Sequence, residues 1–98
     1  MLEFLKQYRR LVTTGGGPAY AARAYAAQSP TGAWEAWFAF FPVNGGRIVT
    51  SGPETFAETL DALDLWTKRI SSLDLHSALE RALDRTNTRR HHHARQHA

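Results

Sequence analysis

Few side chains of this sequence are spaced to do chemistry together, and the best candidates are Arg23, Tyr25 and Glu35. A carboxylate such as Glu35 works as a general acid or base when a second carboxylate or a histidine lies nearby. The sequence places no such group at an obvious spacing from Glu35. Arg23 and Glu35 lie on consecutive predicted strands, so we expect a cross-strand ion pair worth a fraction of a kcal/mol. The sequence therefore predicts a protein that is not an enzyme.

A run of glycines, Gly15 to Gly17, followed by Pro18, is typical of a phosphate-binding loop only in its composition. No Lys-Ser or Lys-Thr pair follows the run, and no clear strand precedes it. We expect residues 13–18 to be a flexible hinge. The sequence also shows no Ser-His-Asp set, paired-carboxylate motif or nucleotide fingerprint. Cysteine is absent, which excludes zinc–cysteine sites, and we expect neither a cofactor nor a metal.

The C-terminal residues 86–98 are basic and rich in histidine. From Arg85 to the end the chain holds four Arg, four His and no acidic residue. Three interpretations stay open: a disordered solvated tail, a weak nucleic-acid-binding tail, or adventitious binding of a divalent metal. In the second interpretation, arginines supply non-specific, salt-dependent affinity for phosphates. The arginines concerned are Arg85, Arg89, Arg90 and Arg95.

Size and composition indicate one soluble globular domain. The chain has 98 residues, of which 43 % are hydrophobic and 21 % charged, as in an ordinary folded domain. The longest apolar run, residues 36–41, is too short to cross a bilayer, and the N-terminus lacks the pattern of a secretory signal. We therefore expect a cytoplasmic protein. The net charge of +3 belongs to the tail, so the body of the domain is nearly neutral.

The first half of the chain is predicted to hold a short helix and a three-stranded antiparallel meander. Apolar residues recur at helical spacing over residues 1–12, which predicts an N-terminal helix. The sheet is predicted within residues 19–51, with strands over residues 20–27, 33–41 and 47–51. Turn residues separate these segments, and the second strand is rich in Trp and Phe.

The strongest hairpin signal is Asn44-Gly45, because both central positions of a type I′ turn need positive φ. Closing this turn would pair Phe40 with Val49, and Phe41 with Ile48. The second and third predicted strands would then form one tight hairpin.

Two helices are expected after the sheet. Residues 53–70 are predicted to form the main helix, which opens on Pro53 and carries one apolar stripe. The stripe consists of Phe56, Leu60, Leu63, Trp66 and Ile70. A second helix is predicted over residues 72–85, and residues 86–98 are predicted to be a disordered tail. The predicted fold is therefore α+β, in the order α-β-β-β-α-α, with a single domain over residues 1–85.

Both faces of the aromatic second strand are apolar. Strand alternation puts Trp34, Ala36, Phe38 and Phe40 on one face and Glu35, Trp37, Ala39 and Phe41 on the other. The main helix can cover one face. The N-terminal helix covers the other, or that face is an interface with a partner or a second copy. Trp37→Ala distinguishes these alternatives, because it disrupts folding in the first and only association in the second.

Two family resemblances bear on function. The region of residues 32–70 resembles the N-terminal domain of HicB-type antitoxins, which hold a toxin partner inactive. The matching features are Gly32, Trp34, Phe41-Pro42, Gly45, Thr50-Ser51-Gly52 and the acidic segment of residues 54–58.

A second resemblance is to a group of short, uncharacterised bacterial proteins of about this length. It runs from Tyr20 to Leu83 and rests on the segments of residues 20–25 and 32–37 and on Trp66. It implies a common fold and brings no activity.

The sequence therefore predicts a small, non-catalytic protein-interaction module that self-associates through an aromatic sheet face, as a homodimer. By its HicB-type resemblance it would hold a partner protein. The alternative is a nucleic-acid-associated protein that uses the basic tail. The predicted partner-binding residues are Arg23, Tyr25, Glu35, Trp37 and Phe41.

Overall fold

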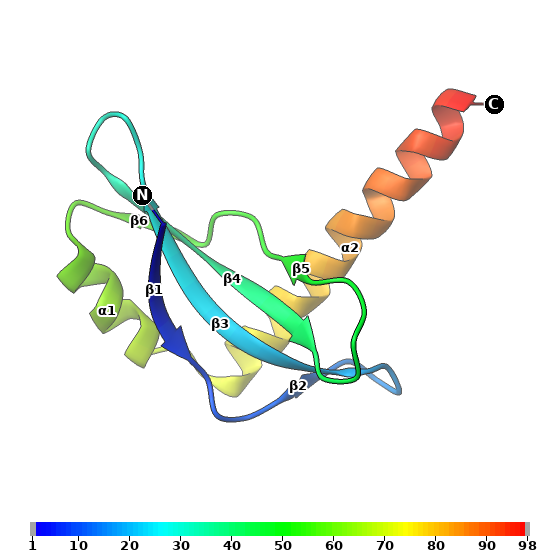
Figure 1. The fold of residues 1–98 in the computed structure, drawn as a ribbon, viewed down its shortest axis with the longest axis horizontal. Helices are drawn as coiled ribbons and strands as arrows, with labels where there is room; N and C mark the ends of the chain where they lie inside the picture. The colour runs from blue at the N-terminus through cyan, green and yellow to red at the C-terminus, as the bar shows by residue number, and fades with distance from the viewer. Residues whose placement is uncertain (1, 98) are drawn as a thin grey trace.

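The computed structural model describes residues 2–97, and the side chains of residues 2–86. It is an α+β fold in which six strands precede two helices (Figure 1). The strands are β1 Leu2–Gln7, β2 Val12–Thr13, β3 Ala19–Gln28, β4 Trp34–Pro42, β5 Val49–Thr50 and β6 Thr55–Ala57. The helices are α1 Leu60–Lys68 and α2 Ser72–His97.

All strands belong to one antiparallel sheet built on two long central strands. β3 and β4 pair from Tyr20 opposite Pro42 to Gln28 opposite Trp34. β1 and β2 both pair with β3 and form one edge. β5 and β6 both pair with β4 and form the other edge. The sheet is thus one continuous hairpin in its centre, with an interrupted strand on each side.

The two helices lie on the same face of this sheet (Figure 1). Alternate residues of the central strands point towards them and are buried: Ala22, Ala24, Ala26, Ala36, Phe38 and Phe40. Leu75, Ala78, Leu79 and Ala82 of α2 complete the larger core, and Leu63 of α1 completes a smaller one around Ala26 and Ala36. Small alanines on the strands let the helices approach closely, and each buried Phe contributes about 2–3 kcal/mol.

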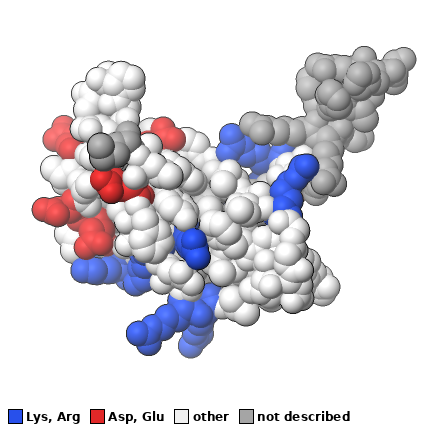
Figure 2. All heavy atoms as spheres, in the orientation of Figure 1, with Lys and Arg blue, Asp and Glu red and all other residues white. Residues whose placement is uncertain are grey.

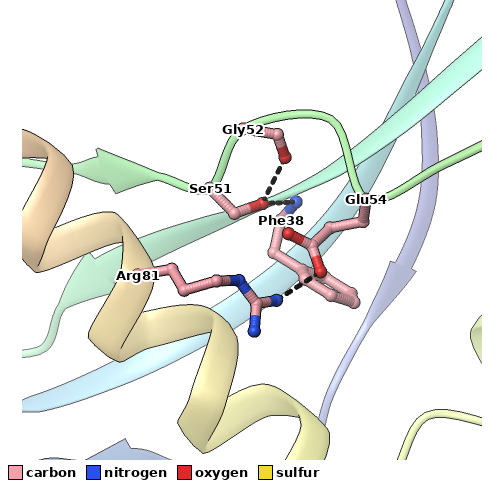
Figure 3. A network of polar contacts seen from close by, with 5 residues as sticks. All are labelled: Phe38, Ser51, Gly52, Glu54 and Arg81. Carbon is pink, nitrogen blue, oxygen red and sulfur yellow. Dashed lines mark hydrogen bonds and ion pairs between the residues drawn. The ribbon is translucent and has the colours of Figure 1, made fainter.

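The interruption between β5 and β6 is held by hydrogen bonds to β4 (Figure 3). The backbone N–H of Ser51 donates to Phe38 O over 2.9 Å, and Phe38 N–H donates to Ser51 Oγ over 3.0 Å. The Ser51 hydroxyl in turn donates to Gly52 O over 2.9 Å. Glu54 N–H then donates to Ala36 O, and its carboxylate accepts from Arg81 of α2 over 2.6 Å. These bonds hold the connection between β5 and β6 against the helix layer.

The predicted three-stranded meander with an N-terminal helix is wrong, because residues 1–12 contain β1 and β2 instead. Leu2 and Phe4 share one face of β1, opposite Ala27 and Tyr25. A bulge between Phe4 and Lys6 changes the alternation, and the apolar positions then mimic a helical period. The N-terminus widens the sheet, and it does not cover a face.

The predicted main helix over residues 53–70 is wrong in its first turns. Thr55–Ala57 is strand β6, and α1 begins only after Thr59. The Thr59 hydroxyl accepts a hydrogen bond from Ala62 N–H, which makes Thr59 the N-cap. Phe56 therefore belongs to the sheet, where it lies opposite Glu35.

Both glycine-containing turns differ from their predictions. Residues 13–18 connect β2 to β3 in a tight turn, with Gly17 N–H donating to Thr14 O, whereas a hinge between a helix and the sheet was expected. At Asn44-Gly45 positive φ occurs at Gly45 and Gly46, and no described non-glycine residue has positive φ. The type I′ turn is therefore wrong. The pairing of Phe40 with Val49 is confirmed.

The second helix begins as predicted. Ser71 and Asp74 cap it reciprocally: Asp74 N–H donates to Ser71 Oγ, and Ser71 N–H donates to Asp74 Oδ2. α2 then continues to His97, past the predicted end at residue 85. Within the described residues, neither helix combines the length and the apolar character that a bilayer-crossing segment requires.

Candidate interaction surface

The side of the sheet that faces away from α1 and α2 carries large side chains, and we call it the open face. Strand register brings eight residues together there, from β1, β3, β4 and β6. They are Leu2, Phe4, Arg23, Tyr25, Glu35, Trp37, Phe41 and Phe56. The same face holds the polar residues Gln7 and Thr50 and the small residues Ala21, Ala27 and Ala39.

An aromatic row crosses the middle of the open face. Phe4 lies opposite Tyr25, and Tyr25 lies opposite Trp37, in one line across three strands. The Phe4 and Tyr25 ring centroids are 5.8 Å apart with an edge-to-face arrangement. The Tyr25 and Trp37 rings stack at 6.3 Å. These pairs add about 0.5–1.5 kcal/mol each beyond area burial and hold the rings in a fixed position.

Apolar side chains at the edges of the open face are largely exposed, and the central rings of Tyr25 and Trp37 are partly buried. Phe4 is 56 % exposed, Phe56 is 64 % exposed and Leu2 is 63 % exposed. A strongly exposed apolar group at an edge is common in isolation, but contiguous apolar patches mark interaction sites. The structure places no other described element over this patch, since both helices pack on the opposite side.

Arg23 lies beside the aromatic row, with its guanidinium 4.6 Å from the centroid of the Phe41 ring. This is a cation–π contact. The Arg23 Nε atom is buried and has no hydrogen-bond partner. Within residues 2–86, the ion pairs of the structure involve other residues. The positive charge of Arg23 is therefore not matched by a carboxylate of its own described chain.

The predicted ion pair between Arg23 and Glu35 is wrong. Arg23 lies opposite Ala39, and Glu35 lies opposite Ala27, at opposite ends of the open face. The connection over residues 29–33 sets this register, with Ser29 N–H bonded to Ala33 O. Glu35 lies instead between Ala27 and Phe56.

All five predicted partner-binding residues nevertheless lie on the open face: Arg23, Tyr25, Glu35, Trp37 and Phe41. Leu2, Phe4 and Phe56 were not among the predicted residues, because their segments were predicted to be helical. The signal that was present is the period-2 spacing of Leu2 and Phe4. For Phe56, the signal was the short apolar segment after Pro53 that ends before the Thr59 cap.

Charge is unevenly distributed around the molecule. Figure 2 shows most Asp and Glu on the side where α1 lies, and Lys and Arg mainly along the opposite and lower edges. The segment of residues 58–64 alone holds Glu58, Asp61 and Asp64. Between these groups the strands present mostly uncharged atoms. The acidic side chains therefore gather on one side of the molecule, and the basic side chains are spread more widely.

A cleft of about 380 Å³ lies on the helix side, between β4, α1 and α2. Its carboxylates already have partners: Glu54 binds Arg81, and Asp74 caps α2. Hydrogen bonds from the Ser71 backbone and hydroxyl hold the pKa of Asp74 below its usual range. The remaining lining includes the stacked rings of Phe38 and Trp66. The polar groups of this cleft thus serve the packing of the helices.

Two other polar groups of the core are also structurally engaged. The Tyr8 hydroxyl donates to Thr67 O over 2.9 Å, and burial raises the pKa of Tyr8 to about 12. The Ser51 hydroxyl accepts a hydrogen bond from Phe38 N–H and donates one to Gly52 O, which holds the connection between β5 and β6. No cluster of three metal-ligating side chains occurs among the residues that the structure describes. The open face is therefore the best-supported candidate surface.

The arginines of the alternative prediction divide into two groups. Arg85 is exposed on α2, and its guanidinium lies close to Gly52 in the connection between β5 and β6. Arg89, Arg90 and Arg95 lie outside the residues whose side chains are described, and their role stays a prediction.

No protein-family model, curated protein or solved structure matches the chain.

Proposed function

We propose that this chain is a small, non-catalytic protein-interaction module that self-associates through the open face. The observation that carries the proposal is the one-sided packing of the fold. Both helices cover one face of the sheet, and the other face keeps a continuous aromatic surface. Water would contact this surface in an isolated chain, and a second copy would remove it from water at about 25 cal/mol per Å² of apolar area.

The size of the open face is compatible with a specific but moderate interface. Nine residue pairs join β3 and β4, and an edge strand lies on each side. With about 3.4 Å per residue and 4.8 Å per strand, two such faces would bury roughly 1,100 Å² in total. Specific interfaces begin at about 1,000 Å². An interface of this size is compatible with a reversible dimer.

The types of residue on the open face also favour binding. Tyr and Trp bring large contact areas for few rotatable bonds, and they are enriched among residues that dominate binding energy. Here Tyr25 and Trp37 are already stacked on one another in the single chain. Little side-chain entropy is left to lose on association.

The HicB-type resemblance adds a partner protein to this proposal. In that case the module would hold its partner through the same dimeric assembly. The support for this part is the resemblance of residues 32–70 alone, and the open face supports self-association directly.

The test is the molar mass in solution as a function of concentration, measured by light scattering or sedimentation equilibrium. We expect the mass to rise with concentration towards twice the 11.0 kDa of one chain. Trp37→Ser and Phe56→Ser should each keep the protein monomeric over the same range. Leu73→Ser is the matched control, because Leu73 is 72 % exposed on α2, away from the open face.

A wild-type protein that stays monomeric at millimolar concentration would contradict the proposal. So would a dimer that survives both open-face substitutions. Far-UV circular dichroism of each variant checks that the fold is retained, and Phe56 at an exposed edge is the substitution that endangers the fold least.

A further inference from the structure

Resting on the proposed self-association, we infer how the second copy sits on the open face. The geometry points to a symmetric dimer whose strands run antiparallel across the interface, so that Glu35 of each copy meets the partner's Arg23. The two-fold axis runs along the aromatic row. The molecule on the open face is thus a second copy of this chain, in one orientation.

The open face is arranged almost symmetrically about its aromatic row. Tyr25 and Trp37 are opposite one another in the centre. Two residues along in one direction lie Ala27 and Glu35, and two residues along in the other lie Arg23 and Ala39. Each flanking row is therefore about 7 Å from the centre. On β3 and β4 each flanking row pairs one small residue with one charged residue, and the two charges are opposite. On the edge strands Leu2 and Phe56 extend the row of Glu35, and Gln7 and Thr50 extend the row of Arg23.

A two-fold axis that lies between the two sheets, parallel to the aromatic row, places each flanking row of one copy over the opposite flanking row of the other copy. Each strand then faces the same strand of the other copy, running in the opposite direction. Glu35 lies over the partner's Ala39, beside the partner's Arg23. Arg23 lies over the partner's Ala27, beside the partner's Glu35. Both ion pairs form at once, as an interface with two-fold symmetry requires.

Within its own chain Arg23 lacks the partner that this arrangement supplies. Its guanidinium rests on the Phe41 ring at 4.6 Å, and Arg23 takes part in none of the ion pairs found within residues 2–86. A guanidinium stacked on an aromatic ring is already partly stripped of water and held in position. It binds a carboxylate with two parallel hydrogen bonds better than a mobile lysine would.

The competing symmetric orientation brings like charges together. With the two-fold axis along the strands, each row faces the same row of the other copy. Both Glu35 side chains would then share one row and both Arg23 side chains another. Like charges juxtaposed in an interface oppose binding, and the opposite charges steer association and fix the register. Sheets packed face to face keep their strands within about 30° of one another, so both orientations are sterically possible and the charges select the first.

The experiment is a charge-reversal exchange in the full-length chain. Glu35→Arg alone and Arg23→Glu alone each turn two attractive contacts into two repulsive ones. Each should raise the dimer dissociation constant at least about tenfold at low ionic strength. An equimolar mixture of the two single variants restores both contacts in a mixed dimer. The double variant restores both contacts in a dimer of identical copies. The dissociation constants of the mixed dimer and of the double variant should both return to within about threefold of wild type.

Asp84→Arg and Arg47→Glu are the controls for net charge, because both residues are exposed and neither lies on the open face. They should leave the dissociation constant unchanged. Sedimentation equilibrium of an isotopically or fluorescently labelled copy distinguishes mixed dimers from like dimers. Circular dichroism checks the fold of every variant.

The possible failures are distinguishable. A wild-type protein that is monomeric overturns both the proposed function and this inference. A dimer that Trp37→Ser abolishes but that neither charge reversal weakens overturns only the orientation. Single reversals that weaken the dimer without rescue by the mixture or the double variant also overturn the orientation. Rescue by both establishes it.

Discussion

The two faces of the same sheet are built from alternate residues of the same two strands, yet they differ in almost every property. The covered face carries Tyr20 and Trp34 at its two ends and alanines and phenylalanines between them, and these alanines and phenylalanines are at most 1 % exposed. The open face carries the rings of Tyr25, Trp37 and Phe41 together with one arginine and one glutamate. Small residues let α1 and α2 approach the covered face. Large, fixed rings with polar neighbours are suited to a surface that meets a separate molecule.

The contrast shows how a small domain divides its apolar residues. The covered face has lost almost all contact with water, and its residues therefore determine the stability of the single chain. The open face has apolar groups still in contact with water and contributes less to folding. Neighbouring residues of β4 should therefore respond very differently to the same substitution, because they lie on different faces.

The largest expected effect is the difference between Phe38→Ala and Trp37→Ala. Phe38 is 1 % exposed, and its ring stacks on Trp66 at 5.2 Å. Its truncation should cost about 3–5 kcal/mol of unfolding free energy. Trp37→Ala, measured at concentrations where the protein is monomeric, should cost less than about 1.5 kcal/mol. Urea unfolding measures both, and equal losses would contradict the division of roles between the two faces.

A pH-dependent effect is expected on the covered face, at Tyr8. Its pKa rises from 10.0 to about 12 in the folded chain, because the phenol is buried. The folded chain thus holds this proton more tightly than the unfolded chain. The stability that Tyr8 contributes is complete below pH 10 and falls as the pH rises towards 12.

Tyr8→Phe is the matched variant for this prediction. It should lose about 0.5–1.5 kcal/mol at neutral pH, from the hydrogen bond to Thr67 O. It should also remove most of the fall in stability between pH 10 and pH 12. Urea unfolding at several pH values measures this, and an unchanged alkaline profile in Tyr8→Phe would contradict it.

The smallest expected effect on association is that of removing residues 87–98. The open face lies in the body of the domain, so the truncated chain should dimerise with a dissociation constant within about twofold of wild type. Any affinity for nucleic acid should fall with truncation and should depend steeply on salt. Fluorescence anisotropy with a labelled oligonucleotide measures the second quantity. Nucleic-acid affinity that is unchanged by truncation would remove the tail hypothesis.

The open face was partly predictable because β4 has an unambiguous period of two. Glu35, Trp37 and Phe41 alternate strictly with buried residues, so their common face could be read from the sequence. The flanking turn residues bounded the strand on both sides. The class of fold, α+β, was likewise accessible from the order of aromatic strands and apolar helical stripes.

The edges of the sheet were not predictable in the same way. Leu5, Tyr8 and Val12 fit a helical spacing as well as they fit an interrupted strand, and the choice depends on pairing with β3. The segment of Phe56 continues the helical stripe of residues 60–70 in sequence, but the free edge of β4 takes it into the sheet. Tertiary pairing outweighs local propensity in both segments.

The predicted ion pair between Arg23 and Glu35 was wrong for a related reason. The distance between Arg23 and Glu35 depends on the strand register, and the register depends on how many residues the connection between the strands uses. Gly32 supplies the positive φ of that connection, but several loop lengths are compatible with its sequence. The charges were correctly placed on one face, and only their separation was wrong.

Self-association through the open face is tested most directly by NMR. The experiment follows the indole N–H signals of the three tryptophans while the protein is diluted. Trp37 lies on the open face, whereas Trp34 and Trp66 pack against the smaller core. If copies associate through the open face, the Trp37 signal shifts with concentration, and the Trp34 and Trp66 signals stay in place. A concentration-independent Trp37 signal, or shifts confined to the other two, would contradict the assignment of the open face as the interface.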